Sequence, residues 1–186
     1  MLLSCSLVAL SVLASRSPEA DLPFSDASDP VAVITGWTPH TPNEAGAAIC
    51  DVGSAVDGLR CRGPNCEEIR LHCLKTNYTT GTQTTIHVSA GNLPSAECPA
   101  NAWVTSLTCS GEHCNNIFMD CREFAGVKPT NCVYSEFVSG SSGGEVLLYS
   151  GYYLRGLECE AGTSDHGGVT YCERLSLYSC KMTPEG

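Results

Sequence analysis

The sequence predicts an all-β fold, a pseudo-threefold β-prism of three repeats stapled by disulfides, with a β-trefoil as the alternative. The chain of 186 residues has 13 cysteines, 18 glycines and 10 prolines, which is typical of a loop-rich scaffold held by disulfides. Its cysteines recur at a fixed spacing. The residues around each inner cysteine pair fit a β-hairpin with one apolar face. Three such units can bury those faces only against a shared axis.

The cysteine spacing defines the repeats. The first copy has the pattern C-x10-C-x4-C-x6-C, which returns without a gap after 48 residues. These two copies contain Cys50, Cys61, Cys66 and Cys73, and then Cys98, Cys109, Cys114 and Cys121. A third copy contains Cys132, Cys159, Cys172 and Cys180. It differs by a longer central loop, Glu160 to Tyr171, and by Leu148 at the position of Cys50 and Cys98. The copies span about 36–80, 81–125 and 126–186.

The inner cysteines of each copy predict the register of its hairpin. If Cys61 faces Cys66 across a four-residue turn, Gly58 lies opposite Ile69 on the apolar face. Asp57 then lies opposite Arg70 on a solvated face. A slip of one residue would exchange the two faces, so the pattern specifies the register.

Directly opposed residues of antiparallel strands lie close enough for a disulfide. We therefore expect the inner bridges Cys61–Cys66, Cys109–Cys114 and Cys159–Cys172. The remaining cysteines of each copy then form the outer bridges Cys50–Cys73, Cys98–Cys121 and Cys132–Cys180. This nested arrangement is one of the three pairings that four cysteines allow.

The N-terminal region predicts a secreted chain. Residues 1–14 form a short apolar run that ends in small residues and is interpreted as a signal peptide, although no Lys or Arg precedes it. Its removal takes away Cys5 and leaves an even number of cysteines. Residues 15–35 are interpreted as an acidic linker or pro-segment, and 36–186 as a single β domain. No later run has the length of a transmembrane segment, so we expect an extracellular protein.

Composition and motifs restrict the function. The net charge of −10 argues against nucleic acid and anionic membrane surfaces as partners. The sequence has no serine-hydrolase elbow, phosphate loop or metalloprotease signature, and its five histidines lack metal-ligand spacing. We therefore expect no catalytic activity, no cofactor and no metal. The sequon at Asn77 predicts a glycosylated, exposed loop.

Four residues are candidates for ligand binding. Trp103 and Tyr153 occupy equivalent positions in copies two and three, on the face opposite the predicted core. Exposed aromatic rings there can stack on sugars, although packing against an outer strand explains them equally well. Asp165 and His166 lie in the longest loop, which breaks the symmetry of the repeats and is either a recognition loop or a tolerated insertion. Trp37, before the first hairpin, is open to both interpretations.

The second copy resembles a known family. Glu97-Cys98-Pro99, Val104, Leu107, Asn116-Ile117 and Cys121 resemble the repeat of vitelline membrane outer layer protein I. That resemblance implies a threefold β-prism and an extracellular coat or carbohydrate-binding role. The chain departs from it where Cys50-Asp51 replaces Cys-Pro and in its inner cysteine pairs. A looser likeness is to cysteine-rich β-prism domains of secreted pore-forming proteins, where such a module binds membranes.

Together, these features predict a secreted, non-enzymatic binding module whose partner is a glycan of a cell wall or extracellular coat. The alternative is a structural or effector-like host-interaction protein that binds another protein. The sequence does not indicate an oligomeric state.

Overall fold

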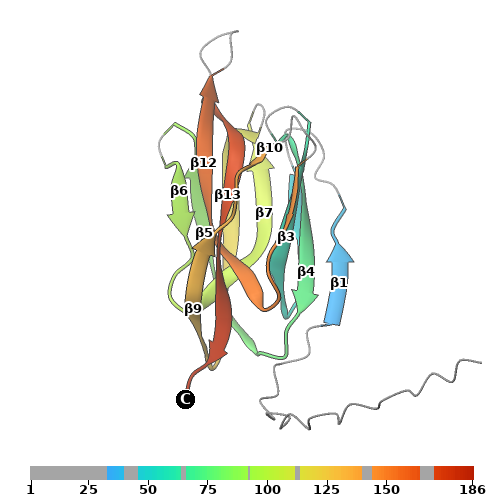
Figure 1. Cartoon of the computed structure of the whole chain (residues 1–186), viewed down its shortest axis with the longest axis vertical. Helices are drawn as coiled ribbons and strands as arrows, with labels where there is room; N and C mark the ends of the chain where they lie inside the picture. The colour runs from blue at the N-terminus through green and yellow to red at the C-terminus, as the bar shows by residue number, and fades with distance from the viewer. Residues whose placement is uncertain are drawn as a thin grey trace, which may run out of the picture.

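The computed structural model describes residues 33–39, 46–63, 66–91, 93–111, 114–139, 144–163 and 170–186. In these ranges the chain is all-β and forms three antiparallel sheets (Figure 1). Sheet A has the strand order β1 (Val33–Trp37), β4 (Glu68–Lys75), β3 (Ser54–Arg62), β11 (Glu145–Leu147). Sheet B has the order β5 (Thr80–Ser89), β8 (Asn116–Phe124), β7 (Ala102–Ser110), β2 (Gly46–Ile49). Sheet C has the order β10 (Val138–Ser139), β13 (Thr170–Pro184), β12 (Tyr152–Thr163), β6 (Ser95–Glu97), and β9 (Val127–Tyr134) also pairs with β13.

The three sheets share one plan. Each contains a central hairpin, an edge strand beside the second strand of that hairpin, and a short strand beside the first. The short strand comes from a different repeat: β2 joins sheet B, β6 joins sheet C and β11 joins sheet A. We call these three the donated strands. Because each repeat donates a strand to another sheet, the exchange forms a closed cycle that ties the sheets together.

Equivalent backbone hydrogen bonds dock the residue that follows each donated strand. The amide of Leu148 donates to the carbonyl of Asp57 at 2.8 Å. The amides of Cys50 and Cys98 donate to the carbonyls of Thr105 and Arg155 at 2.9 and 2.7 Å. These acceptors stand at the same place in the three hairpins, so the repeat in the sequence is also a repeat of interactions.

Each hairpin has a β-bulge near its start. In sheet A, Val56 pairs with Cys73 but Gly58 pairs with His72, which leaves Asp57 as the extra residue. The ladders of sheets B and C shift at the equivalent places, at Thr105 and Arg155. A bulge reverses the alternation of side chains along the strand. Val56 and Leu59 are therefore both buried, although an uninterrupted strand would put them on opposite faces.

The predicted hairpin register is wrong. Leu59 pairs with Leu71, and Cys61 pairs with Ile69 rather than with Cys66. The cause is local: Cys66 has a positive φ of 55° and lies in the turn, so it closes its disulfide without entering the ladder. The predicted pair of Asp57 with Arg70 is also absent, because Arg70 pairs with Arg60 across the strands and Asp57 contacts His72.

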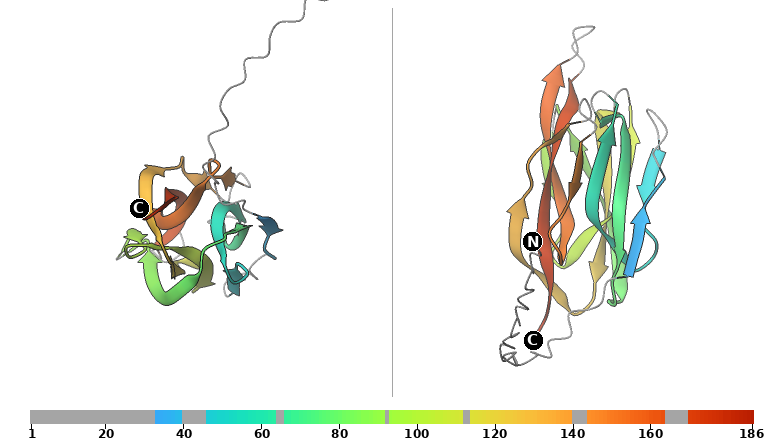
Figure 2. Two further views of the ribbon diagram at one scale, coloured as in Figure 1. Left: turned by 90° about the horizontal axis from the view of Figure 1, so that it is seen from below. Right: turned by 45° about the vertical axis from the view of Figure 1, so that its right-hand side comes forward.

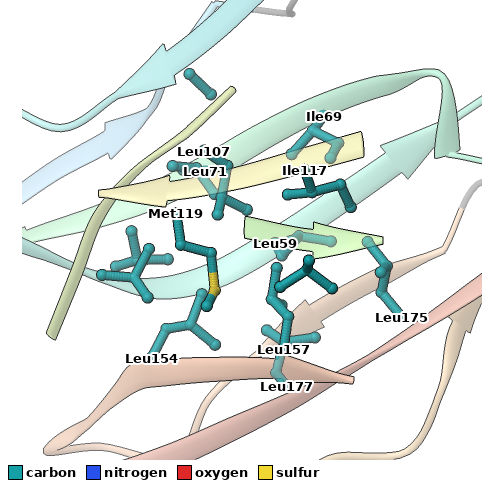
Figure 3. Packing of buried hydrophobic residues seen from close by; sticks show 14 of the residues in the cluster. Leu59, Ile69, Leu71, Leu107, Ile117, Met119, Leu154, Leu157, Leu175 and Leu177 are labelled. Atoms are coloured by element: carbon teal, nitrogen blue, oxygen red, sulfur yellow. The ribbon is translucent and has the colours of Figure 1, made fainter. Parts of the chain in front are cut away.

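The larger of two hydrophobic clusters, the main core, lies between the sheets. Seen along the long axis, the three sheets lie around a common interior (Figure 2). Each sheet contributes aliphatic side chains to it (Figure 3), and those labelled are Leu59, Ile69, Leu71, Leu107, Ile117, Met119, Leu154, Leu157, Leu175 and Leu177. All of these are at most 1% exposed. The first strands of the hairpins, β3, β7 and β12, contact one another across this interior.

Six disulfides bridge the described residues, in the pairs that the repeat spacing predicts. They are Cys50–Cys73, Cys61–Cys66, Cys98–Cys121, Cys109–Cys114, Cys132–Cys180 and Cys159–Cys172. Such a set indicates an oxidising environment. Two of the outer bridges link sheets, because Cys50 and Cys98 follow strands donated to the neighbouring sheet. Cys132–Cys180 instead joins β9 to β13 within sheet C.

The ends of the predicted segments can be compared with the strands in part. β1 begins at Val33, inside the range 15–35 that was interpreted as a linker, so the sheet starts earlier than expected. The predicted signal peptide and the rest of that linker lie outside the described residues. Among the residues that are described, no helix has the length and apolarity needed to cross a bilayer.

Small residues admit the donated strands. Gly58, Ser106 and Gly156 pair with Leu147, Ile49 and Glu97 in the three sheets. A Cβ atom on Gly156 would lie 2.5 Å from the carbonyl oxygen of Ala96, a backbone atom that cannot move aside cheaply. The small residue at this position of each hairpin therefore leaves room for the donated strand beside it.

Replacing Gly156 with alanine is expected to lower the free energy of unfolding by about 1 to 3 kcal/mol, because the added methyl overpacks the contact with β6. Urea unfolding of the oxidised protein measures the change. Gly91→Ala is the matched control, since nothing lies within 4 Å of the added Cβ. Equal stabilities of the two variants would show that β6 is not held as tightly as the structure indicates.

Candidate functional site

Two interpretations were open for Trp103 and Tyr153, exposed rings that stack on sugars or rings packed in the protein, and the structure shows packing. Trp103 is 0% exposed and Tyr153 is 7% exposed. Both belong to a second hydrophobic cluster, which also contains Ala55, Phe124 and Val127. The rings of Trp103 and Phe124 meet edge to face, with centroids 6.0 Å apart. Neither aromatic ring is accessible for stacking on a sugar.

This second cluster explains why the equivalent positions of the three hairpins hold apolar or aromatic residues. Ala55, Trp103 and Tyr153 lie two residues before the bulged residues, one in each hairpin. They face away from the main core, as predicted, but the cluster around Phe124 covers them. Burial raises the pKa of the Tyr153 phenol, and the nearby charge of Asp57 raises it further.

A buried cation lies beside this cluster. Arg155 donates hydrogen bonds to the carbonyls of Cys98 and Pro99 at 2.6 and 2.8 Å. Its guanidinium also lies 5.6 Å from the centroid of the Trp103 ring. Burial lowers the pKa of Arg155, and the charge of Glu97, 3.4 Å away, opposes that effect. These contacts hold the end of β6 against β12 and are structural.

The other predicted positions lie elsewhere. Asp165 and His166 fall outside the described residues. Asn77 is exposed in the turn between β4 and β5, as its sequon predicts, and its glycosylation stays a prediction. Of the four predicted ligand residues, the two that the structure describes are buried, and a role of Asp165 and His166 stays a prediction.

A groove between sheets C and A is a better candidate. It has a volume of about 280 Å³ and is bordered by the end of β9 and by β11 with the residues that follow it. We call it the Tyr134 groove. Its lining consists of Val133, Tyr134, Ser135, Glu136, Val146, Leu147, Leu148, Tyr149 and Ser179.

Two exposed tyrosines line the groove. Tyr134 is 59% exposed and Tyr149 is 79% exposed. Tyr134 packs on Tyr178 with ring centroids 4.8 Å apart, and Tyr149 packs edge to face on Tyr152 at 6.2 Å. Each ring is thus supported on one side and accessible on another. Supported aromatic rings provide contact area at a low cost in conformational entropy.

The backbone beside Tyr134 is held firmly. The amide of Ser135 donates to the carbonyl of Leu177 at 2.9 Å, and the Ser135 hydroxyl accepts from the amide of Leu177 at 3.0 Å. The carbonyl of Ser135 accepts from the hydroxyl of Ser176 at 3.0 Å. These three bonds attach the wall of the groove to β13, so its shape exists before any ligand binds.

The groove also offers polar groups. Partial burial raises the pKa of Tyr134, and the charge of Glu158 raises it further, so the phenol stays protonated and can donate a hydrogen bond. The exposed carboxylate of Glu136 lies on the same wall and can accept one. Apolar ring faces next to a few hydrogen-bonding groups are the usual chemistry of a small-molecule site.

The groove lies where the third repeat lacks an intersheet disulfide. Leu148 and Ser179 occupy the positions of Cys50 and Cys73 in the first repeat. Both line the groove, at the place where the first repeat has its disulfide Cys50–Cys73. Cys132 does not replace the missing bridge, because its partner is Cys180 on the neighbouring strand.

Sequence reasoning missed Tyr134 and Tyr149 because they lie outside the hairpin alignment. Tyr134 ends the edge strand and Tyr149 follows the donated strand. One available signal was the substitution of Leu148 for cysteine, which marks the only repeat whose donated strand is not bridged. The described residues contain no group of three His, Cys, Asp or Glu side chains arranged to hold a metal ion.

Comparisons of the chain with known protein families, with curated proteins and with solved structures give no significant match. The site is therefore interpreted from its own geometry.

Proposed function

We propose that this is a secreted, non-enzymatic module that binds neutral glycans of a cell wall or extracellular coat in the Tyr134 groove. The observation that carries the proposal is the pair of exposed tyrosines, Tyr134 and Tyr149, that line one groove. Aromatic side chains provide large, rigid and amphipathic contact surfaces, which suit the apolar faces of pyranose rings.

Charge restricts the class of sugar. The chain has a net charge of −10, and Glu136 lines the groove itself. A carboxylate accepts hydrogen bonds from sugar hydroxyls but repels sulfate, sialic acid and uronic acid groups. We therefore expect neutral hexoses or N-acetylhexosamines as ligands and no binding of anionic glycans.

Replacing Tyr134 or Tyr149 with alanine is expected to weaken glycan binding about tenfold, which corresponds to about 1.4 kcal/mol for the lost ring contact. A glycan array followed by calorimetry on the strongest neutral hit measures the effect. Leu93→Ala is the control, because Leu93 is a half-exposed hydrophobic residue outside the groove.

Two results would overturn the proposal. One is an array on which the wild-type protein binds no sugar. The other is a neutral hit that both tyrosine variants bind as well as the wild type. Binding confined to sulfated or sialylated glycans would contradict the inferred charge preference.

A protein partner is the second candidate function. Leu147 and Val133 border the groove and Phe137 lies near it, and all three expose much of their apolar surface. An exposed apolar patch of this kind is typical of protein interaction sites. Two results together would favour this class: the wild-type protein binds no sugar on the array, and it binds a cell-surface protein that the Leu147→Asp variant does not bind.

For the fold, we propose a threefold β-prism of the kind seen in vitelline membrane outer layer protein I. Three separate sheets with the same strand plan support a prism over a trefoil, in which a single barrel would be expected. An experimental structure tests this directly.

Secretion is tested by N-terminal sequencing of the protein from the culture medium, which should begin at Ser15.

A further inference from the structure

We propose that the chain carries a second site for the same class of neutral glycan, on sheet A, so that one chain binds two sugar ligands and can cross-link them. The site is a groove of about 170 Å³ beside Trp37, which we call the Trp37 groove. This inference rests on the proposed function of the Tyr134 groove. It is supported by three residues that the two grooves share at equivalent positions: an aromatic residue, the hydroxyl residue that follows it and an aliphatic residue of the donated strand.

The aromatic residues correspond first. Trp37 ends edge strand β1 and pairs with His72, while Tyr134 ends edge strand β9 and pairs with Tyr178. His72 and Tyr178 occupy the same position in their sheets, because they pair with the equivalent glycines Gly58 and Gly156. Trp37 packs on His72 with ring centroids 5.1 Å apart, as Tyr134 packs on Tyr178. Each groove therefore has one supported aromatic ring on the same wall.

The next residue is held in the same way in both grooves. The amide of Thr38 donates to the carbonyl of Leu71 at 2.8 Å, and its hydroxyl accepts from the amide of Leu71 at 3.0 Å. Ser135 makes the same two bonds with Leu177, the equivalent residue of the third repeat. The carbonyl of Thr38 accepts from Arg70, where that of Ser135 accepts from a serine. The same backbone frame thus presents both aromatic rings.

The opposite walls also correspond. Ile49 ends donated strand β2 and lines the Trp37 groove, as Leu147 ends β11 and lines the Tyr134 groove. Each of these aliphatic side chains is more than half exposed. Asp51 supplies one exposed carboxylate to the Trp37 groove, and Glu136 supplies one to the Tyr134 groove from a different position in its repeat. Both grooves therefore combine an aromatic ring, an aliphatic side chain and a hydrogen-bond acceptor.

Two differences predict unequal sites. The floor of the Trp37 groove contains the disulfide Cys50–Cys73, and its smaller volume predicts a shallower, weaker site. Asp51 also stands where the third repeat has Tyr149, so only one ring contacts the ligand. We expect the Trp37 groove to bind the same sugars more weakly than the Tyr134 groove.

Sheet B lacks the aromatic residue. At the equivalent position of its edge strand β5, Thr85 pairs with Asp120 and donates a hydrogen bond to its carboxylate at 2.6 Å. The structure therefore supports two sites rather than three. The two grooves lie beside different sheets, since β1 is the edge strand of sheet A and β9 pairs with β13 in sheet C. Two separate glycan chains can then be bound at once.

The two tryptophans of the chain allow a direct test by NMR. Trp37 is partly exposed in its groove, whereas Trp103 is fully buried. The protein is titrated with triacetylchitotriose and, separately, with cellotriose, each to about 10 mM so that sites with millimolar Kd values fill. We expect saturable shifts of the indole N–H signal of Trp37, with no shift for Trp103, and shifts at the Tyr134 groove at lower sugar concentration.

Variants separate the second site from the first. Trp37→Ala should leave one site per chain, and Tyr134→Ala should leave the weaker one. Asp51→Asn, at an exposed residue that cannot disturb the core, should weaken the second site alone. Beads coated with the bound oligosaccharide should be agglutinated by the wild type and by Leu93→Ala, but not by Trp37→Ala or Tyr134→Ala.

Each outcome decides between the two proposals. One site per chain, lost in Tyr134→Ala and unchanged in Trp37→Ala and Asp51→Asn, would overturn the second site and leave the proposed function intact. No binding of either sugar would overturn the second site together with neutral-glycan binding by the first groove. A Trp37 signal that shifts only together with that of Trp103 would indicate a global change and would also count against the second site.

Discussion

Replacing Trp103 with alanine is expected to lower the free energy of unfolding by about 3 to 5 kcal/mol, the usual range for a buried tryptophan. Trp103 has no exposed surface, and its ring packs against Phe124 and beneath the guanidinium of Arg155. Its removal leaves a cavity in the cluster where the three hairpins begin, and this cluster cannot collapse without moving all three sheets. Small domains are stable by only about 5 to 15 kcal/mol, so the loss is a large fraction of the total.

Urea unfolding of the oxidised protein, followed by circular dichroism, measures this loss. Trp37→Ala is the matched control, because Trp37 is only partly buried on an edge strand and its removal leaves no closed cavity. We expect the control to lose less than half as much stability as Trp103→Ala. Equal losses would mean that Trp103 is more exposed than the structure indicates, and would reopen its interpretation as a ligand residue.

The cysteine pattern predicted much of the fold. A repeated spacing defines which cysteines are equivalent, and loops closed by neighbouring cysteines restrict the pairing, so all six bridges could be expected without coordinates. The position of these bridges relative to the sheets could not be predicted. Cys50 follows a strand that pairs with β7 of another repeat, and no local pattern distinguishes a donated strand from one that stays in its own sheet.

The hairpin register could not be predicted because two local features act on it at once. The turn at Cys66 has a positive φ that sequence alone does not require of a cysteine. The bulge at Asp57 then inserts one residue and reverses the faces of the residues before it. An alternation count across the whole strand therefore assigns Val56 and Leu59 to opposite faces, although both are buried.

The candidate sites depend on the same strand exchange. Tyr134 and Tyr149 belong to the same repeat, but they line one groove only because β11 leaves that repeat and joins sheet A. The pairing of Trp103 with Tyr153 as equivalent residues was correct, and both face away from the main core. The sequence left open whether they are exposed or covered, and it did not indicate which residues cover them, among them Phe124 at the end of β8.

Removing the disulfide Cys98–Cys121, as the double variant C98A/C121A, is expected to lower the free energy of unfolding by about 3.5 kcal/mol. The chain-entropy model gives this value for a closed loop of about two dozen residues. The bridge also links sheets, because Cys98 follows β6 in sheet C while Cys121 lies in β8 of sheet B. The carbonyl of Cys98 is in addition an acceptor for Arg155. If position 98 becomes more mobile without the disulfide, the buried Arg155 loses a hydrogen-bond acceptor.

The double variant C109A/C114A is the control that separates these effects. Its disulfide closes a turn within one hairpin, with a sequence separation of 5, and the same model gives about 2 kcal/mol for so short a loop. Both variants replace two buried cysteines in sheet B or at its border, so the loss of apolar contact is similar. Urea unfolding without reductant should rank C98A/C121A as the less stable of the two. The opposite ranking would show that the donated strand β6 is held by its hydrogen bonds to β12 and that the bridge between the sheets adds little.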